Sequence, residues 1–348
     1  MPDALIRKEG RAGRITLNRP KALNALTYEM CLAIDAALVA WRDDGDVALV
    51  LIDAEGERAF CAGGDIAEMY ASGTRGDYAY GRRFWADEYR MNARIAVYPK
   101  PVVSFLQGFT MGGGVGVGCH GSHRIVGETS KIAMPECGIG LVPDVGGSLL
   151  LARAPGRLGE YLGVTGARMG PADAILAGFA DLYVPEAGWE ALKSRLVETG
   201  DAGLATAAAV VPPDGILADL RPEIDRHFAG ETMGDILRSL RHGTGAFAAD
   251  ALAAASSPSP LSAAVTVEMI HRLRGSADMY RALDLEYRFT YRSMEQADFL
   301  EGIRAAIIDK DRQPKWRHRS AEQVPAADVA RLLMPLGKNA LTFEEISK

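Results

Sequence analysis

Apolar residues in the first half of the chain follow two spacings in turn, one typical of buried strands and one typical of amphipathic helices. Thr27 is a typical N-cap for the first of the helices. Because strands and helices alternate, we expect an α/β fold. The predicted strands are 13–17, 47–52, 102–106, 124–126, 131–133 and 181–184, and the predicted helices are 28–41, 78–96, 149–152, 158–162 and 171–177.

The pattern changes after about residue 200. Residues 200–260 are rich in Ala, Gly, Pro and Ser. Within them, the proline-containing segments 210–213 and 256–260 are typical of connections. Helical spacing returns at 264–273 and 279–302. We therefore expect an α/β core with the active site over residues 1–200 and a mainly helical region over residues 201–348.

Composition narrows the class of protein. With 348 residues, 48% hydrophobic and 24% charged, the chain is typical of globular domains. The net charge of −6 and the lack of a basic block exclude a nucleic-acid partner. The chain has no apolar run of about 18 residues, so we expect neither a membrane span nor a membrane anchor. Four cysteines without CxxC spacing indicate a reducing compartment, by default the cytoplasm, and no structural zinc.

Two glycine-rich segments follow predicted strands. Residues 59–66 contain the pair Gly63 and Gly64, and residues 108–118 contain a glycine triplet. Glycine lets a backbone N–H approach a ligand closely, so two such donors can hold a developing oxyanion. The alternative is that these glycines only form tight turns or close packing.

Carboxylates in apolar surroundings form the other candidate group. Glu136 and Asp144 lie in the apolar, glycine-rich segment 134–147, where acid/base or nucleophilic work would explain two acids, although a solvated loop is the alternative. Glu88 lies at the edge of the apolar stripe of the helix at 78–96, and Asp87 borders its other side. An exposed acid is the alternative for Glu88.

Four segments together resemble the enoyl-CoA hydratase/isomerase (crotonase) superfamily, and within it the 3-hydroxyisobutyryl-CoA hydrolases. The resemblance covers about residues 5–330 and implies a spiral of ββα units followed by a helical C-terminal region. It also implies an acyl-CoA substrate, no separate cofactor, and assembly into a homo-oligomer. The segments are ITLNRPKALNALT (15–27), FCAGGDI (60–66), TMGGGVG (110–116) and MPECGIGLVPDVGG (134–147).

Matching positions imply roles for individual residues. The amides of Gly64 and Gly113 would form the oxyanion hole, and Glu88, Gly113 and Lys21 would contact the substrate. Hydratases of the superfamily carry a glutamate where this chain has Gly116. Here Glu136 and an additional acid, Asp144, would instead hydrolyse the thioester, releasing 3-hydroxyisobutyrate and CoA. Glu136 would attack the carbonyl carbon or activate water.

Other functions have weaker support. Residues 116–121 satisfy GxGxxG, but the preceding strand ends about ten residues too early for a dinucleotide site. His120 and His123 lack a partner motif for a metal. The enzymatic alternative is an enoyl-CoA hydratase or isomerase, which Asp144 disfavours. The non-enzymatic alternative is an acyl-CoA-binding protein, which would not need Glu136.

Overall fold

The computed structural model describes residues 2–343 and divides into two compact units, each built from three stretches of chain. This differs from the expected boundary at residue 200; the outer ends of the two expected regions, residue 1 and residues 344–348, lie outside the described residues. Early segments join the late helices because they share a core with them, as Trp85 and Phe299 do with ring centroids 5.5 Å apart. The first unit comprises Met1–Asp65, Asp87–Ala133 and Arg168–Gly215, and the second comprises Ile66–Ala86, Met134–Ala167 and Ile216–Lys348.

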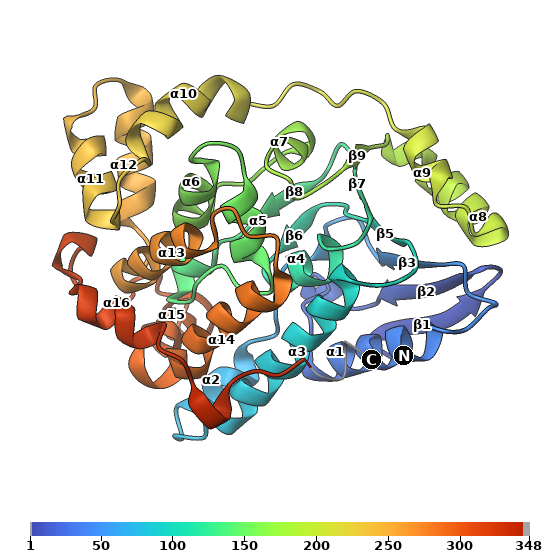
Figure 1. Ribbon diagram of the computed structural model, residues 1–348, viewed down its shortest axis with the longest axis horizontal. Helices are drawn as coiled ribbons and strands as arrows, with labels where there is room; N and C mark the ends of the chain where they lie inside the picture. Colours follow the sequence, from blue (N-terminus) through green and yellow to red (C-terminus); the bar gives the residue numbers. More distant parts are fainter. Residues whose placement is uncertain (1, 344–348) are drawn as a thin grey trace. The chain divides into compact units, whose positions relative to one another are not determined.

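A six-stranded sheet with the order β1-β2-β3-β5-β7-β9 forms the framework of the first unit (Figure 1). β1 and β2 are antiparallel, and the other neighbours are parallel. The parallel pairs confirm the α/β class, because each needs a crossover connection. The strands are β1 (Ala4–Glu9), β2 (Ala12–Leu17), β3 (Leu49–Ala54), β5 (Val102–Phe105), β7 (His123–Val126) and β9 (Leu182–Tyr183).

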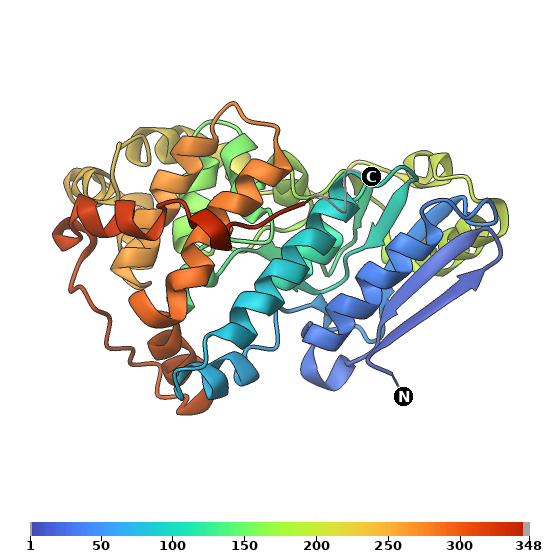
Figure 2. The same cartoon turned by 60° about the horizontal axis from the view of Figure 1, so that its bottom comes forward.

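A second sheet of three short parallel strands, in the order β4-β6-β8, carries the glycine segments. Its strands are β4 (Ala59–Cys61), β6 (Phe109–Met111) and β8 (Lys131–Ala133). Figure 2 shows α1 lying along β1 and β2. The helices of this unit are α1 (Tyr28–Trp41), α4 (Gly113–Gly118), α7 (Pro171–Leu176), α8 (Trp189–Thr199) and α9 (Gly203–Ala208), together with the C-terminal half of α3 (Ala79–Ala96).

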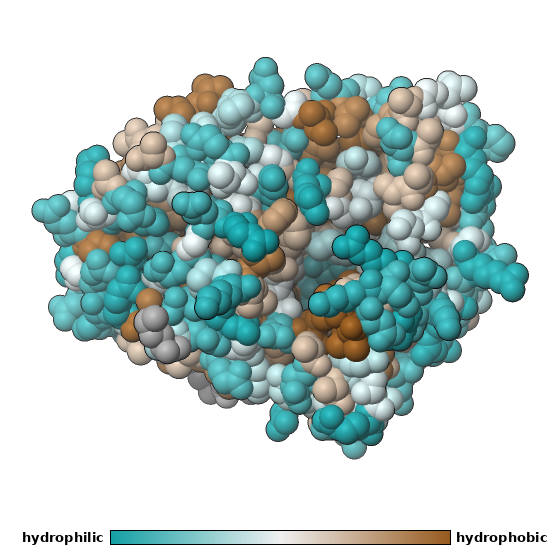
Figure 3. Space-filling model, turned by 180° about the vertical axis from the view of Figure 1, so that it is seen from behind, coloured by the Kyte–Doolittle hydropathy of each residue, from teal (hydrophilic) through white to brown (hydrophobic). Residues whose placement is uncertain are grey.

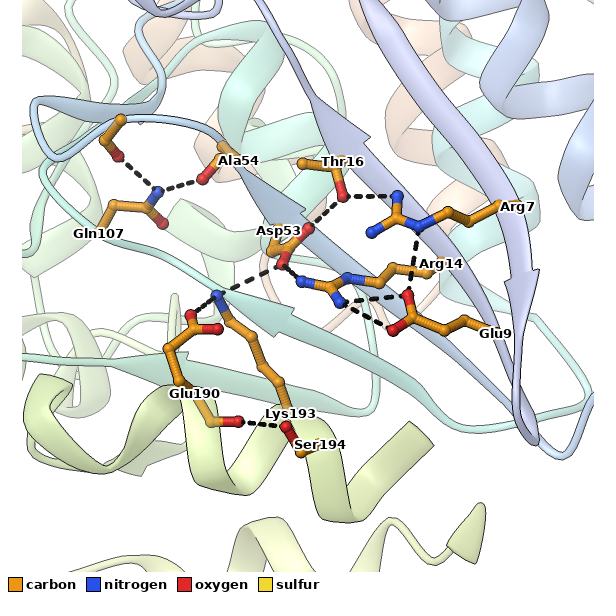
Figure 4. A network of polar contacts seen from close by, with 11 residues as sticks. Arg7, Glu9, Arg14, Thr16, Asp53, Ala54, Gln107, Glu190, Lys193 and Ser194 are labelled. Atoms are coloured by element: carbon orange, nitrogen blue, oxygen red, sulfur yellow. Dashed lines mark hydrogen bonds and ion pairs between the residues drawn. The ribbon is translucent and has the colours of Figure 1, made fainter. Parts of the chain in front are cut away.

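The larger sheet and α8 share an apolar core and one buried ionic network. Leu51, Phe105 and Trp189 belong to that core. Beside it, Asp53 at the end of β3 is only 2% exposed and accepts hydrogen bonds from Arg14 Nη2 (2.7 Å) and Thr16 Oγ1 (2.7 Å). Lys193 Nζ of α8 lies 3.3 Å from Asp53 Oδ2 (Figure 4). The network therefore joins β2, β3 and α8 through one carboxylate.

The second unit is helical, which confirms the helical character expected of the C-terminal region. The connections expected at 210–213 and 256–260 agree with the structure, because residues 210–213 lie between α9 and α10 and residues 257–259 lie between α12 and α13. The rest of the stretch 200–260 is largely helical, in α9 to α12. The alanines of α12 favour a helix, and Thr232 and Asp235 form a capping box for α11. The helices are α2 (Ala67–Gly73), α5 (Gly147–Arg153), α6 (Leu158–Thr165), α10 (Leu217–His227), α11 (Met233–His242), α12 (Ala246–Ser256), α13 (Pro260–Leu273), α14 (Met279–Gln296), α15 (Phe299–Ile303) and α16 (Ala326–Leu332).

Charged and polar side chains cover most of the face that Figure 3 shows, and hydrophobic ones lie among them singly or in small groups. Across residues 2–343, no helix is long and apolar enough to cross a membrane.

Candidate active site

Two glycine segments of the first unit lie side by side after β4 and β6. Gly64 follows β4, and Gly113 is the first residue of α4. A Cβ added to Gly113 would lie 3.4 Å from the backbone nitrogen of Gly64, so the two segments are in contact. Gly112 has φ +48°, a backbone that other residues rarely adopt. The structure thus brings together the two amides that the oxyanion hypothesis needs.

Glu88 on α3 lies next to this pair. Its carboxylate oxygen Oε1 would be 3.0 Å from a Cβ added to Gly113, and the residue is 4% exposed. Asp87 is engaged elsewhere, because it accepts a hydrogen bond from Tyr28 Oη (2.6 Å) and pairs with Arg90. The alternative of an exposed acid at position 88 is therefore wrong, and Glu88 is the carboxylate beside the glycines.

Glu136 lies in the second unit at the start of a short 3₁₀ helix, η2 (Glu136–Ile139). The next residue ties η2 to α13: the Cys137 carbonyl accepts the N–H of Ser259 (3.0 Å), and its Sγ lies 3.2 Å from Thr266 Oγ1. Glu136 is 5% exposed, and within the described residues its Oε2 is buried without a hydrogen-bond partner. Such an oxygen is costly unless it acts on a ligand.

Asp144 lies in the same unit and is 4% exposed. Burial raises the pKa of Glu136 well above its ordinary value, and the charge of Asp144 raises this pKa further. The alternative of a loop with two solvated acids is therefore wrong. A buried carboxylate with a raised pKa and an unpaired oxygen can act as a base or as a nucleophile.

Sequence reasoning missed another buried carboxylate of the second unit, Glu286 on α14. It accepts hydrogen bonds from the backbone of Gly146 and Ser148, close to Asp144. Burial raises its pKa to about 8, although the bonds from Ser148 and Gly146 lower it. Glu286 could have been found by the argument used for Glu88, because Ala282, Leu283 and Phe289 lie three and four positions away on the buried side of the helix.

Lys21 and the GxGxxG run are the other candidates from the sequence. Lys21 lies on a 3₁₀ turn, η1 (Pro20–Ala22), and is exposed, so its contact with CoA stays a prediction. Gly116 and Gly118 lie inside α4, where a Cβ on Gly118 would meet Leu106 and Phe60 at 2.6 and 2.7 Å. The GxGxxG run at 116–121 therefore begins in the close-packed C-terminal half of α4 and ends beyond the helix. No set of three His, Cys, Asp or Glu residues between 2 and 343 is arranged to hold a metal ion.

A family model and curated relatives point to the same family. The model of the family described as enoyl-CoA hydratase/isomerase matches residues 12–333. Two curated relatives named 3-hydroxyisobutyryl-CoA hydrolase, mitochondrial, from Gallus gallus and Homo sapiens, are 35% and 34% identical, with 97% and 98% of this chain covered and 90% and 91% of theirs.

Solved structures agree on the fold. An enoyl-CoA hydratase from Rhodobacter sphaeroides 2.4.1 is 62% identical, with a TM-score of 0.95 over 98% of this chain and 100% of that one. A carnitinyl-CoA dehydratase from Mycobacterium thermoresistibile is 44% identical, with a TM-score of 0.93 over 98% of this chain and 99% of that one. These likenesses and the family match confirm the crotonase-like fold expected from the sequence.

Proposed function

The chain belongs to the enoyl-CoA hydratase/isomerase family, and we propose that within it this protein hydrolyses 3-hydroxyisobutyryl-CoA to 3-hydroxyisobutyrate and CoA. The observation that carries the proposal is Glu136, a buried carboxylate with one unpartnered oxygen and a raised pKa. The hydrolase relatives, which match over nearly the whole chain, support the choice of thioester.

Stabilisation of the oxyanion is assigned to two glycine amides of the first unit. When the thioester carbonyl is attacked, its oxygen becomes negative, and the N–H groups of Gly64 and Gly113 donate hydrogen bonds to it. Donors that are fixed in advance stabilise this charge without reorganising, and losing one such donor typically costs about 2.7–4 kcal/mol in the transition state. Glu88, beside Gly113, contacts the acyl group.

The attack on the carbonyl is assigned to Glu136. In its ionised form Glu136 adds to the carbonyl carbon, the C–S bond breaks, and CoA leaves as a thiolate. Water then cleaves the mixed anhydride and regenerates the carboxylate. Direct activation of water by Glu136 gives the same products. Asp144 orients the water or the substrate hydroxyl and assists proton transfer.

Enoyl-CoA hydration is the second candidate function, and the 62% identical structure described as an enoyl-CoA hydratase supports it. Adding water across a double bond needs proton transfer at two carbons, for which hydratases of the family use two glutamates. Gly116 supplies no carboxylate at the position of one of them, and Asp144 supplies one elsewhere. These differences favour the thioester hydrolase.

A free-thiol assay and the absorbance of the enoyl thioester separate the two reactions. We expect CoA release from 3-hydroxyisobutyryl-CoA and neither CoA release nor hydration from crotonyl-CoA. Glu136→Gln should lower turnover by at least about a hundredfold, because it removes the nucleophile or base. Asp144→Asn should also lower turnover. Hydration of crotonyl-CoA without CoA release would exclude the hydrolase.

Three points stay predictions. The four cysteines are free and buried, which supports a reducing compartment. The cytoplasm is one such compartment, whereas the vertebrate relatives are named mitochondrial. Assembly into a homo-oligomer and contact of Lys21 with the CoA phosphates are likewise proposals for size measurements and binding assays.

A further inference from the structure

The backbone between Asp144 and α5 makes an unfavourable turn. Val145 has φ +54° and Gly146 has φ +81°, so two successive residues are left-handed. Glycine adopts this conformation readily, but a β-branched residue such as valine rarely does. A strained residue of this kind persists only where its surroundings hold it in place. The direction of the Asp144 side chain therefore depends on whatever holds this turn.

Glu286 holds the turn from α14. Its Oε2 accepts the N–H of Gly146 (2.9 Å), and its Oε1 accepts the N–H of Ser148 (3.1 Å) and the hydroxyl of Ser148. Helix α5 has no capping side chain of its own at Gly146. Glu286 instead caps the start of α5, although it lies far away in the sequence. It accepts N–H groups that the first turn of a helix leaves unpaired.

Burying the Glu286 carboxylate costs free energy that a residue with only a packing role would avoid. It is 0% exposed, and among the described residues no Lys, Arg or His pairs with it. A buried carboxylate without a cation is less favourable than an apolar side chain of similar size. The charge of another acid, Asp144, also acts on it and raises its pKa. Packing alone would favour leucine or methionine here.

We propose that Glu286 is a positioning residue for the hydrolysis: by fixing the turn at Val145 and Gly146, it aims the Asp144 carboxylate. Both of its oxygens are engaged by Gly146 and Ser148, so it acts through Asp144 and not on the substrate. The inference rests on the proposed function, in which Asp144 takes part in catalysis.

A double-mutant cycle tests this assignment. Glu286→Gln keeps the size of the side chain but turns one oxygen that accepts an N–H into a donor. We expect kcat to fall roughly tenfold to a hundredfold, as a misplaced group causes, while KM changes less than about threefold. In an Asp144→Asn background the same change should alter kcat less than about twofold, because the group it aims is already gone.

Equal losses of kcat in both backgrounds would overturn the positioning role and leave a structural one. Wild-type turnover of Asp144→Asn alone would instead overturn the proposed role of Asp144. Glu160→Gln is the matched control, since Glu160 on α6 is another fully buried glutamate of the second unit and pairs with Arg157, the residue before that helix. Its kcat should stay within about twofold. If Glu286→Gln does not fold, Ser148→Ala removes one hydrogen bond and should show the same dependence on Asp144, with a smaller loss.

Discussion

At the scale of single residues, the chemistry depends on how tightly Glu136 holds its proton. Its surroundings favour the neutral form, because burial removes water and Asp144 adds a like charge. Catalysis by Glu136 requires the ionised form. The same surroundings that make the carboxylate reactive once it is ionised therefore restrict the pH range in which it is ionised.

This conflict predicts the pH dependence of the reaction. We expect kcat/KM to rise along an acid limb whose midpoint lies above 4.5, the ordinary value for glutamate, because the pKa of Glu136 is raised. Asp144→Asn removes a negative charge, so ionisation of Glu136 becomes easier and the limb moves to lower pH even though the maximal rate falls. Rates measured between about pH 5 and 9 test this. An unmoved limb would mean that the two acids are not coupled.

The raised pKa of Glu136 also affects stability. The folded protein binds this proton more tightly than the unfolded chain, so the free energy of unfolding falls as pH rises from 4.5 toward the folded-state value. Glu136→Gln lacks the ionisation. The thermal midpoint of Glu136→Gln minus that of the wild type should therefore increase as pH rises through this range. A constant difference would contradict the shift.

Gly113 gives a residue-scale test of the oxyanion hole. An alanine there would place its Cβ 3.0 Å from Glu88 Oε1 and 3.4 Å from the Gly64 nitrogen, so the Glu88 carboxylate must shift and the added methyl crowds the space beside the Gly64 amide. We expect kcat/KM to fall by about a hundredfold, as for loss of one donor, with an unchanged circular dichroism spectrum. Gly45→Ala is the control, because nothing lies within 4 Å of its added Cβ. Equal activity of both variants would contradict the placement of the thioester oxygen beside Gly113.

At the scale of elements, Asp53 ties β2, β3 and α8 together. Asp53→Ala leaves the guanidinium of Arg14 and the ammonium of Lys193 without their buried partner. We expect the free energy of unfolding to fall by about 3–5 kcal/mol, as when one partner of a buried ion pair is removed. Glu268→Ala, which breaks the exposed pair with Arg272 on α13, should cost less than about 1 kcal/mol. Urea unfolding of both variants measures the difference, and similar costs would contradict the burial argument.

Elements with a clear apolar pattern could be found from the sequence. The strand expected at 131–133 has the observed bounds of β8, and Thr27 caps α1 by accepting the N–H of Met30. β1 escaped notice because it is a half-buried edge strand with Arg7 and Lys8 in it. β4 and β6 are three residues long and adjoin glycines, so their pairing with other strands defines them more than their own pattern does.

Some residues of the candidate site could likewise be found from the sequence and others could not. Gly64, Gly113, Glu88, Glu136 and Asp144 could be named from motifs, and Glu88 also from the apolar stripe of its helix. Glu286 could not be linked to Asp144 from the sequence, because the contact joins residues about 140 positions apart. Likewise, no local pattern shows that Val145 has a left-handed backbone. Contacts between distant residues decide both.

At the scale of the whole molecule, the chain crosses between its two units several times. Composition suggested one boundary near residue 200, since it compares neighbouring stretches of sequence. The structure instead groups 66–86 and 134–167 with the C-terminal helices, and the middle of α3 is a boundary. Glu136 and Asp144 thereby belong with Glu286, whereas Gly64, Gly113 and Glu88 belong to the other unit.

The four buried cysteines have a practical consequence for the enzymologist. Burial raises the pKa of Cys61, Cys119 and Cys137 to about 12, and that of Cys31 well above its ordinary value. Disulfide reagents react with thiolates, so the native protein contributes almost no colour of its own. The colour that develops with substrate therefore reports released CoA alone, and colour that develops in a control without substrate reports unfolding of the protein.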